Sequence, residues 1–273
     1  MAGHEAPHWK IEDLEFSRIA RDEVRRDENL FYLVASASFI ESGSDLYTQN
    51  LVDFFRGDDE VTDWLTQHWE AEELQHGKAL RAYVAHVWPE FDWETAYRGF
   101  LEEYATYCKV ELLAPTRGLE MTARCVVETG TATYYRAMAR STAEPVLRDL
   151  ASRIAADEVS HYKHFYRFFR RYRDEERLSR FRVLGTIGRR TLELKSEDAD
   201  CAIRHVVRTR SPERAGDTAF VQQLSARLNS TVRTNLSAGA TLKMLMRPLE
   251  LPAGVQTMIQ YPIRQFMEHV FLR

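Results

Sequence analysis

Glu73-Leu74-Gln75-His76 and Glu158-Val159-Ser160-His161 are the two Glu-x-x-His segments that decide the interpretation of this 273-residue chain. Each lies in a long stretch with no proline. Residues three apart share one face of an α-helix, so each segment can direct a carboxylate and an imidazole at one metal ion. One such pair is expected by chance among 41 acidic residues and nine histidines. Two pairs, each in its own long helix, indicate a metal site.

Two further carboxylates complete the predicted site. Glu41 follows Phe39 and Ile40 in an apolar helix, and Glu128 follows two valines near the middle of another helix. A carboxylate is costly to bury in such surroundings unless it binds a metal or another cation. Two Glu-x-x-His helices and two further helices with an inward Glu are typical of di-metal sites in ferritin-like bundles. The predicted metal ligands are Glu41, Glu73, His76, Glu128, Glu158 and His161.

Some ligand positions have competitors in the sequence. Glu72 shares a helix face with His76, but only Glu73 repeats the spacing of the second segment. Glu120 competes with Glu128, which lies closer to the middle of its helix. His164 follows one turn after the second segment and is interpreted as a neighbour of the site or a surface residue. The ligand chemistry favours iron, with manganese as the alternative, because oxygen ligands with one imidazole per metal suit both ions.

The composition narrows the classes of function. The net charge is −4 and hydrophobic residues make up 44% of the chain. The sequence has no basic stripe for nucleic acid and no apolar run long enough to cross a membrane, and we expect no signal peptide. Three cysteines without motif spacing predict reduced thiols, and therefore a cytoplasmic protein.

Helical spacing of apolar residues predicts an all-α protein: a ferritin-like four-helix bundle with a long crossover helix and additional N- and C-terminal helices. We expect residues 1–175 to form the bundle and residues 176–273 to form a helical extension packed on it, within a single domain. The predicted bundle helices are 29–56, 60–87, 116–141 and 145–173, with 93–113 as the crossover. The other predicted helices are 14–26, 176–195, 197–208 and 212–235, followed by an irregular tail with short helical pieces that contains Pro248, Pro252 and Pro262.

Three segments resemble the soluble acyl-carrier-protein desaturases. In Trp69–Gly77, a Trp precedes the Glu by four residues and a Gly follows the His. Ile154–His161 places an Asp directly before the Glu, and Glu128-Thr129-Gly130-Thr131 places a Thr three residues after the Glu. The resemblance covers roughly residues 30 to 175, and it is specific in the two Glu-x-x-His segments.

This resemblance implies an oxygen-activating di-iron enzyme. It implies that Glu73 and Glu158 are shared by the two ions, that Thr131 lines the oxygen side of the site and that Asp157 hydrogen-bonds a ligand histidine. It also implies a ferredoxin-type electron donor, an acyl carrier protein as the bearer of the substrate, and a homodimer. The expected reaction is the O₂-dependent oxidation of an unactivated C–H bond. Its most specific form is the desaturation of an acyl chain held by the carrier protein.

Polar residues set the chain apart from the desaturases. Arg124 lies one turn before Glu128, and Asp45 follows Glu41 by four residues. Arg124 is predicted to bind a substrate carboxylate, to pair with Asp45 or to point to solvent. The first option favours an oxygenase or oxidase of a smaller polar substrate, such as an amine or a carboxylic acid. A non-catalytic, iron-binding ferritin-like protein is the third interpretation.

Overall fold

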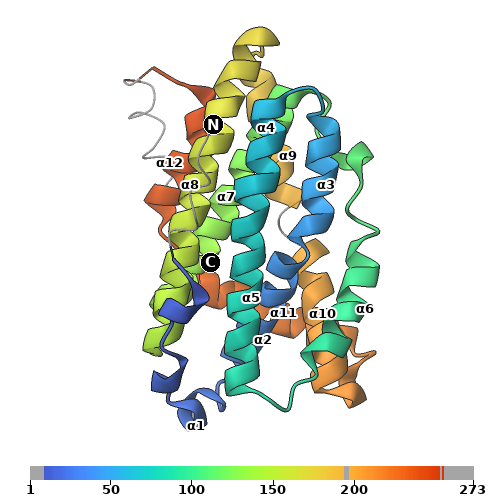
Figure 1. Ribbon diagram of the computed structural model, residues 1–273, viewed down its shortest axis with the longest axis vertical. Helices are drawn as coiled ribbons and strands as arrows, with labels where there is room; N and C mark the ends of the chain where they lie inside the picture. Colours follow the sequence, from blue (N-terminus) through green and yellow to red (C-terminus); the bar gives the residue numbers. More distant parts are fainter. Residues whose placement is uncertain (1–8, 194–196, 253, 255–273) are drawn as a thin grey trace. The chain divides into compact units, whose positions relative to one another are not determined.

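The computed structural model describes residues 9–193, 197–252 and 254, and within them the protein is all-α with no strand, as the sequence predicts (Figure 1). Its architecture is that of an all-α helical bundle. The helices are α1 (Arg21–Val24), α2 (Glu28–Ser42), α3 (Ser44–Phe54), α4 (Asp59–Trp64), α5 (Glu70–Val87), α6 (Trp93–Tyr104), α7 (Arg117–Ser141), α8 (Pro145–Glu175), α9 (Arg180–Glu193), α10 (Glu197–Arg210), α11 (Thr218–Thr234) and α12 (Ala238–Met246).

The described residues form two compact units. The first unit is built from 9–112, 142–153 and 197–229, and the second from 113–141, 154–193 and 230–252. Helix α8 is continuous and contributes residues to both units. Each unit draws on segments from both sides of residue 175, where the sequence places a boundary between bundle and extension.

Aromatic side chains fill the core of the first unit. Phe31 on α2 meets Trp88 edge to face at 5.2 Å between ring centroids, and Phe39 meets Trp93 in the same way at 5.4 Å. The indole N–H of Trp93 donates a hydrogen bond to Ser38 at 2.8 Å, which satisfies a polar group inside this core. Helix α2 also packs against α5 and against α10 (Figure 1).

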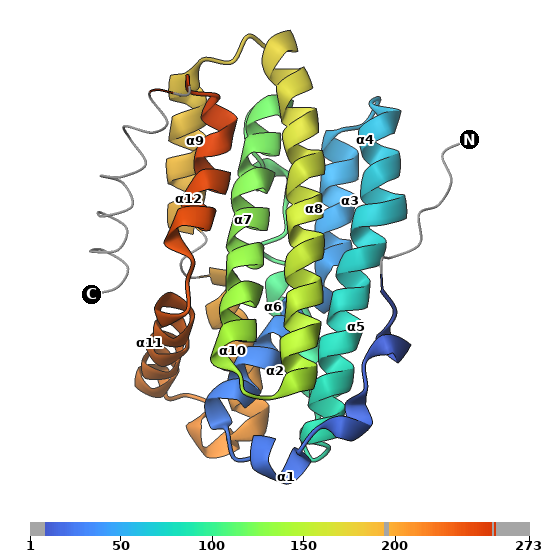
Figure 2. The same ribbon diagram turned by 90° about the vertical axis from the view of Figure 1, so that its left-hand side faces the viewer.

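The second unit packs α9 and α12 against α7, as Figure 2 shows. Its core includes Tyr135 and Met138 of α7, Phe165 and Phe169 of α8 and Val183 of α9. The hydroxyl group of Tyr162 on α8 donates to the carbonyl of Met244 on α12 at 2.7 Å. These contacts hold the α7 and α8 positions that carry the second Glu-x-x-His segment and its partner Glu128.

A break at Gly43 divides the helix that the sequence predicts over residues 29–56. Gly43 has φ −96° and ψ 9°, so α2 ends at Ser42 and α3 begins at Ser44. The hydroxyl group of Tyr97 donates to the carbonyl of Ser42 at 2.6 Å. This bond uses a carbonyl that a continuous helix would pair with a later N–H, which explains why the helix stops one residue after the predicted ligand Glu41.

The predicted helix 60–87 is also interrupted. Residues Leu65–Trp69 form a π-helical turn between α4 and α5, immediately before the first Glu-x-x-His segment. Such turns insert one residue into an α-helix and frequently mark functional sites. A sequence pattern of period 3.6 does not distinguish this insertion from a regular helix.

The predicted helix 14–26 is wrong. The segment forms 3₁₀ turns at Ile11–Asp13 and Phe16–Arg18 and then the short helix α1. Its buried side chains Leu14, Ile19 and Val24 are five residues apart, a spacing that no single helix face can bury. The predicted crossover helix is shorter than expected, because α6 ends at Tyr104 and a 3₁₀ turn follows at Val110–Leu112.

The remaining helices lie close to their predicted positions. Helices α7 and α8 match the predictions 116–141 and 145–173, and α9, α10 and α11 occupy most of 176–195, 197–208 and 212–235. The described part of the tail contains the short helix α12 and a 3₁₀ turn at Arg247–Leu249, in agreement with the short helical pieces that the sequence predicts there. Pro262 lies outside the described residues.

Candidate metal centre

The first ligand set consists of Glu41, Glu73 and His76 in the first unit. One ligand atom from each of the three lies within 4.8 Å of the others. His76 is fully buried and Glu41 is 5% exposed, and His76 Nδ1 lies 3.7 Å from Glu41 Oε2. Glu73 is buried as well, whereas its competitor Glu72 is half-buried. The structure therefore brings together the carboxylate of α2 and the Glu-x-x-His segment of α5.

Gly77 allows this approach of α2 and α5. A Cβ atom at position 77 would lie 2.7 Å from the backbone nitrogen of Ser42 and 2.8 Å from its Cα. Backbone atoms cannot move aside as a side-chain tip can, so only glycine fits between the two helices here. Gly77 directly follows His76, and Ser42 directly follows Glu41. The distance between the two helices at this contact therefore also sets the distance between the two ligands.

Trp9 covers His76, a contact that the sequence does not predict. The two rings stack with centroids 6.2 Å apart and an interplanar angle of 4°. The side-chain amide of Gln75 donates to the Trp9 carbonyl at 3.0 Å. Gln75 lies between Glu73 and His76, so this residue of the motif helps to hold Trp9 over His76. Trp9 and His76 are 67 residues apart, so no local sequence pattern predicts this contact.

The second ligand set consists of Glu128, Glu158 and His161 in the second unit. All three residues are 1% exposed. His161 Nδ1 lies 3.5 Å from Glu128 Oε2 and 4.0 Å from Glu158 Oε2. The two ligand sets have the same composition and arrangement. In each set, the Nδ1 atom of the histidine in the Glu-x-x-His segment faces the single Glu of a neighbouring helix.

These separations suit metal ligands better than direct hydrogen bonds. Typical N–H···O bonds are about 2.7–3.2 Å long, shorter than the 3.5 and 3.7 Å measured in the two sets. Two ligands that each lie about 2.0–2.2 Å from one ion are roughly 3–3.7 Å apart at angles of 90–120°. Each set also has two carboxylates, whose charge one divalent ion balances. Buried Glu and His groups of this protein can therefore hold metal ions.

Glu128 shows the cost of burying these carboxylates without a cation. Burial, and then the negative charge of Glu158, raise the pKa of Glu128 to about 8, while His161 acts in the opposite direction. Its Oε2 atom is buried and accepts no hydrogen bond from any residue that the structure describes. A cation beside this oxygen would remove both penalties, which supports Glu128 over its competitor Glu120 as the ligand from α7.

Thr131 contacts the second set directly. Its hydroxyl group donates to Glu158 Oε2 at 2.6 Å, and this charge-assisted bond fixes one oxygen of that carboxylate. Asp157 is 4% exposed beside Glu158 on α8, and its bond to a ligand histidine remains a prediction. His164 is half-buried, and its Nδ1 lies 3.0 Å from the carbonyl oxygen of Ser160 in its own helix.

Arg124 is buried, which excludes the alternative in which it points to solvent. Only 3% of the residue is exposed, and its Nε lies 2.8 Å from Glu120 Oε1, one turn earlier on α7. Glu120 also accepts a hydrogen bond from the backbone N–H of Ala114 at 2.7 Å. The ion pair accounts for the burial of Glu120 without a metal ion. Asp45, the other predicted substrate residue, is exposed and accepts a hydrogen bond from the N–H of Leu46.

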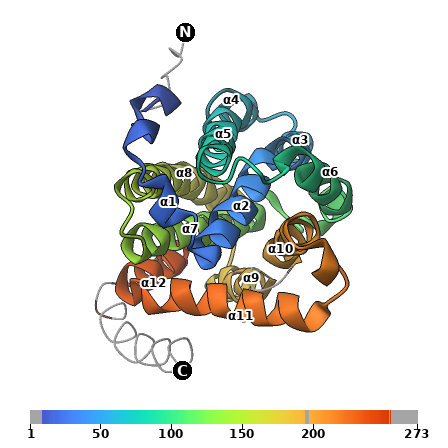
Figure 3. The same ribbon diagram turned by 90° about the horizontal axis from the view of Figure 1, so that it is seen from below.

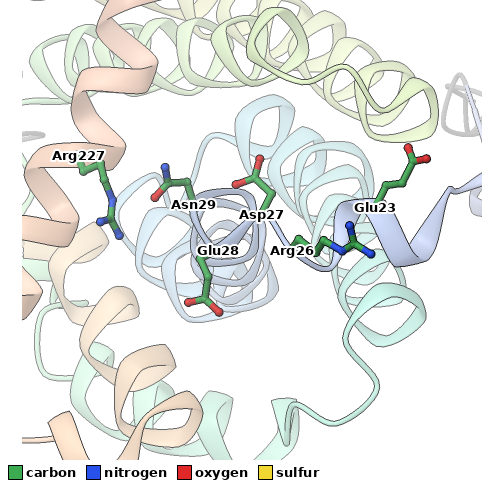
Figure 4. Close-up of a pocket in the computed structure, with 6 residues that line it drawn as sticks. All are labelled: Glu23, Arg26, Asp27, Glu28, Asn29 and Arg227. Carbon is green, nitrogen blue, oxygen red and sulfur yellow. The ribbon is translucent and has the colours of Figure 1, made fainter.

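A surface pocket of about 500 Å³ lies at the start of α2 (Figure 4). Its lining is polar and charged, and Asp27 within it caps α2 by accepting from the N–H of Leu30. None of its residues belongs to the predicted site. The lining residues are Glu23, Arg26, Asp27, Glu28, Asn29 and Arg227.

Comparisons with known proteins leave the family open, because no protein-family model and no curated protein matches the chain. Among the described residues, no helix is both long and apolar enough to cross a membrane.

Proposed function

We propose that the chain binds two iron ions through its two ligand sets and is an O₂-dependent di-iron oxidoreductase. The observation that carries the proposal is the repeated set of two buried carboxylates and one buried imidazole, with matching His–Glu separations of 3.7 and 3.5 Å. Four carboxylates balance the charge of two divalent ions. Oxygen-rich sets with a single nitrogen each favour iron or manganese over zinc or copper.

An iron pair in the reduced state supplies the electrons with which such proteins activate O₂. The chain's own residues have separate tasks. Trp9 and the buried surroundings of His76 exclude water from the first set. Thr131 fixes the orientation of the Glu158 carboxylate through its hydrogen bond. Glu73 and Glu158 would hold the ions together with the other ligands, and the resemblance to the desaturases implies that both ions would share these two carboxylates.

The specific form of the proposal is desaturation of an acyl chain held by a carrier protein, with a ferredoxin-type donor and a homodimeric enzyme. It rests on the three segments that resemble the acyl-carrier-protein desaturases. The pairing of Arg124 with Glu120 weakens the alternative of a small anionic substrate, because the guanidinium charge already has a carboxylate beside it. We therefore take the substrate class, a carrier-bound acyl chain, from the sequence resemblance.

The test is to reconstitute the protein with Fe(II) without oxygen, measure bound iron, and then measure O₂ consumption. We expect two iron ions per chain and O₂ uptake limited by the electrons supplied. Glu128→Gln should lose iron, whereas Glu72→Gln, the same change at a half-buried glutamate outside both ligand sets, should retain it. Accumulation of tens of ferric ions per chain would instead support the storage protein, and zinc binding without any reaction with O₂ would refute the oxidoreductase.

A further inference from the structure

A second group of metal-ligating side chains lies in the first unit, apart from both ligand sets. Glu103 belongs to α6, and Cys201 and His205 belong to α10. One ligand atom from each of the three lies within 4.8 Å of the others. Cys201 and His205 are four residues apart and share one face of α10, and Figure 3 shows this helix beside α6.

The packing of α6 against α10 fixes the direction of the imidazole. A Cβ atom at Gly99 would lie 2.8 Å from His205 Nδ1, so this edge of the ring rests on the backbone of α6. The opposite nitrogen, Nε2, and Glu103 Oε2 form a hydrogen bond of 2.8 Å, which a bound ion would replace. Only 5% of His205 is exposed and Cys201 is fully buried, so neither side chain has freedom to turn away.

The Glu103 carboxylate has different partners on its two oxygens. Oε1 accepts hydrogen bonds from the Arg204 guanidinium and, at 3.2 Å, from the Tyr107 hydroxyl group. Oε2 faces His205, on the side where the Cys201 sulfur also lies. The carboxylate is thus anchored through one oxygen, and the other oxygen is directed at an imidazole and a thiol.

We propose that Glu103, Cys201 and His205 bind a zinc-class divalent ion that joins α6 to α10. Thiolate, imidazole and carboxylate are the donors that zinc takes, usually in a tetrahedral arrangement. The Glu103 side chain is 33% exposed, which leaves room for water as the fourth ligand. Two negative ligands balance the divalent charge, and Arg204 remains on the outer oxygen.

A role for Cys201 as a nucleophile does not fit this environment. Burial and the neighbouring Glu103 carboxylate raise the pKa of the Cys201 thiol to about 12 when no metal is present. Reactive cysteines have lowered pKa values and positive surroundings, so a metal-free Cys201 is inert. Cys201 is therefore not set up for covalent chemistry.

Cobalt(II) is the probe that separates this site from the iron ligand sets. A cysteine ligand gives a thiolate-to-cobalt charge-transfer absorption, and neither iron ligand set contains a cysteine. We expect this absorption to saturate at one cobalt per chain in the wild type. It should persist in the Glu73→Ala/Glu158→Ala double variant, so failure of the di-iron proposal would leave this result unaffected.

Three variants test the ligands. Cys201→Ser should abolish the absorption, and His205→Gln should weaken cobalt binding at least tenfold, the loss expected for one ligand of three. Cys108→Ser and Cys125→Ser should leave it intact, and circular dichroism should confirm that each variant is folded. If Cys201→Ser does not fold, Glu103→Gln replaces it, with the same weakening expected as for His205→Gln. Absence of the absorption in the wild type, or its persistence in Cys201→Ser, would overturn the proposal.

Discussion

Replacement of Gly77 by Ala tests whether the approach of α2 and α5 sets the geometry of the first ligand set. The new Cβ would lie 2.7 Å from the backbone nitrogen of Ser42, so the two helices must separate by about 0.7 Å to reach an ordinary contact of 3.4 Å. Metal sites tolerate deviations of only about 0.2 Å in ligand distance. Since Glu41 and His76 lie on opposite sides of this contact, the substitution displaces one ligand relative to the other.

We expect Gly77→Ala to lower metal affinity by about 10–100-fold, the usual cost of disturbing the shell around metal ligands. Overpacking destabilises the fold by about 1–3 kcal/mol, and the better helix propensity of Ala returns about 1 kcal/mol. The net loss in the free energy of unfolding is then about 0–2 kcal/mol. The effect on metal binding should thus exceed the effect on stability.

The assay combines anaerobic competition of Fe(II) against a chromophoric chelator with urea unfolding of the metal-free protein. Gly118→Ala is the matched control, because its Cβ would meet the tip of the Leu178 side chain at 2.6 Å, an atom that can move aside. The control should bind iron as the wild type does. Equal iron affinity in Gly77→Ala and the wild type, or an equal loss in the control, would refute the reasoning.

Four further predictions concern single contacts. Thr131→Val removes the hydrogen bond to Glu158 and should destabilise the metal-free protein by about 1.5–3 kcal/mol in urea unfolding. Thr122→Val is the control, because it loses only a hydrogen bond within its own helix. Arg124→Leu leaves the Glu120 charge buried and should lower the free energy of unfolding by about 3–5 kcal/mol in the same assay. Adding Glu120→Leu should largely reverse this loss, whereas adding Asp45→Asn should not. Trp9→Ala should speed the dissociation of iron in stopped-flow chelation, because water gains access to His76. The stability of the metal-free protein should fall as pH rises from about 4.3 toward 8 and then level off, because the raised pKa of Glu128 makes the folded state bind more protons in that window; Glu128→Gln should flatten this dependence in thermal melts.

Much of this protein follows from its sequence, because helical periodicity and paired motifs are local properties. The positions of α7 and α8 were predictable from helical periodicity. The burial of Glu41 and Glu128 was predictable because a Glu inside an apolar helix has few alternatives to a cation, and that of Glu73 and Glu158 because both occupy the same place in a repeated motif. The competition between Glu120 and Glu128 illustrates the limit. Both are buried on α7, and only the position of Arg124 relative to Glu120 shows which of the two already has a partner.

The features that sequence could not supply depend on contacts between distant segments. The end of α2 at Ser42 depends on the hydroxyl group of Tyr97, 55 residues later. The cover over His76 comes from Trp9, and the cluster of Glu103 with Cys201 and His205 joins segments about 100 residues apart. None of these leaves a periodic or spaced pattern, because each depends on how helices pack.

Metal stoichiometry is the measurement that tests the central claim most directly. Iron and protein are quantified after anaerobic reconstitution and gel filtration, for the wild type and for variants that each remove one ligand set. The account predicts two iron ions per chain in the wild type, and clear losses in Glu41→Ala/His76→Ala and in Glu128→Ala/His161→Ala. A wild-type protein that holds no iron, or variants of either ligand set that still hold two ions, would contradict it.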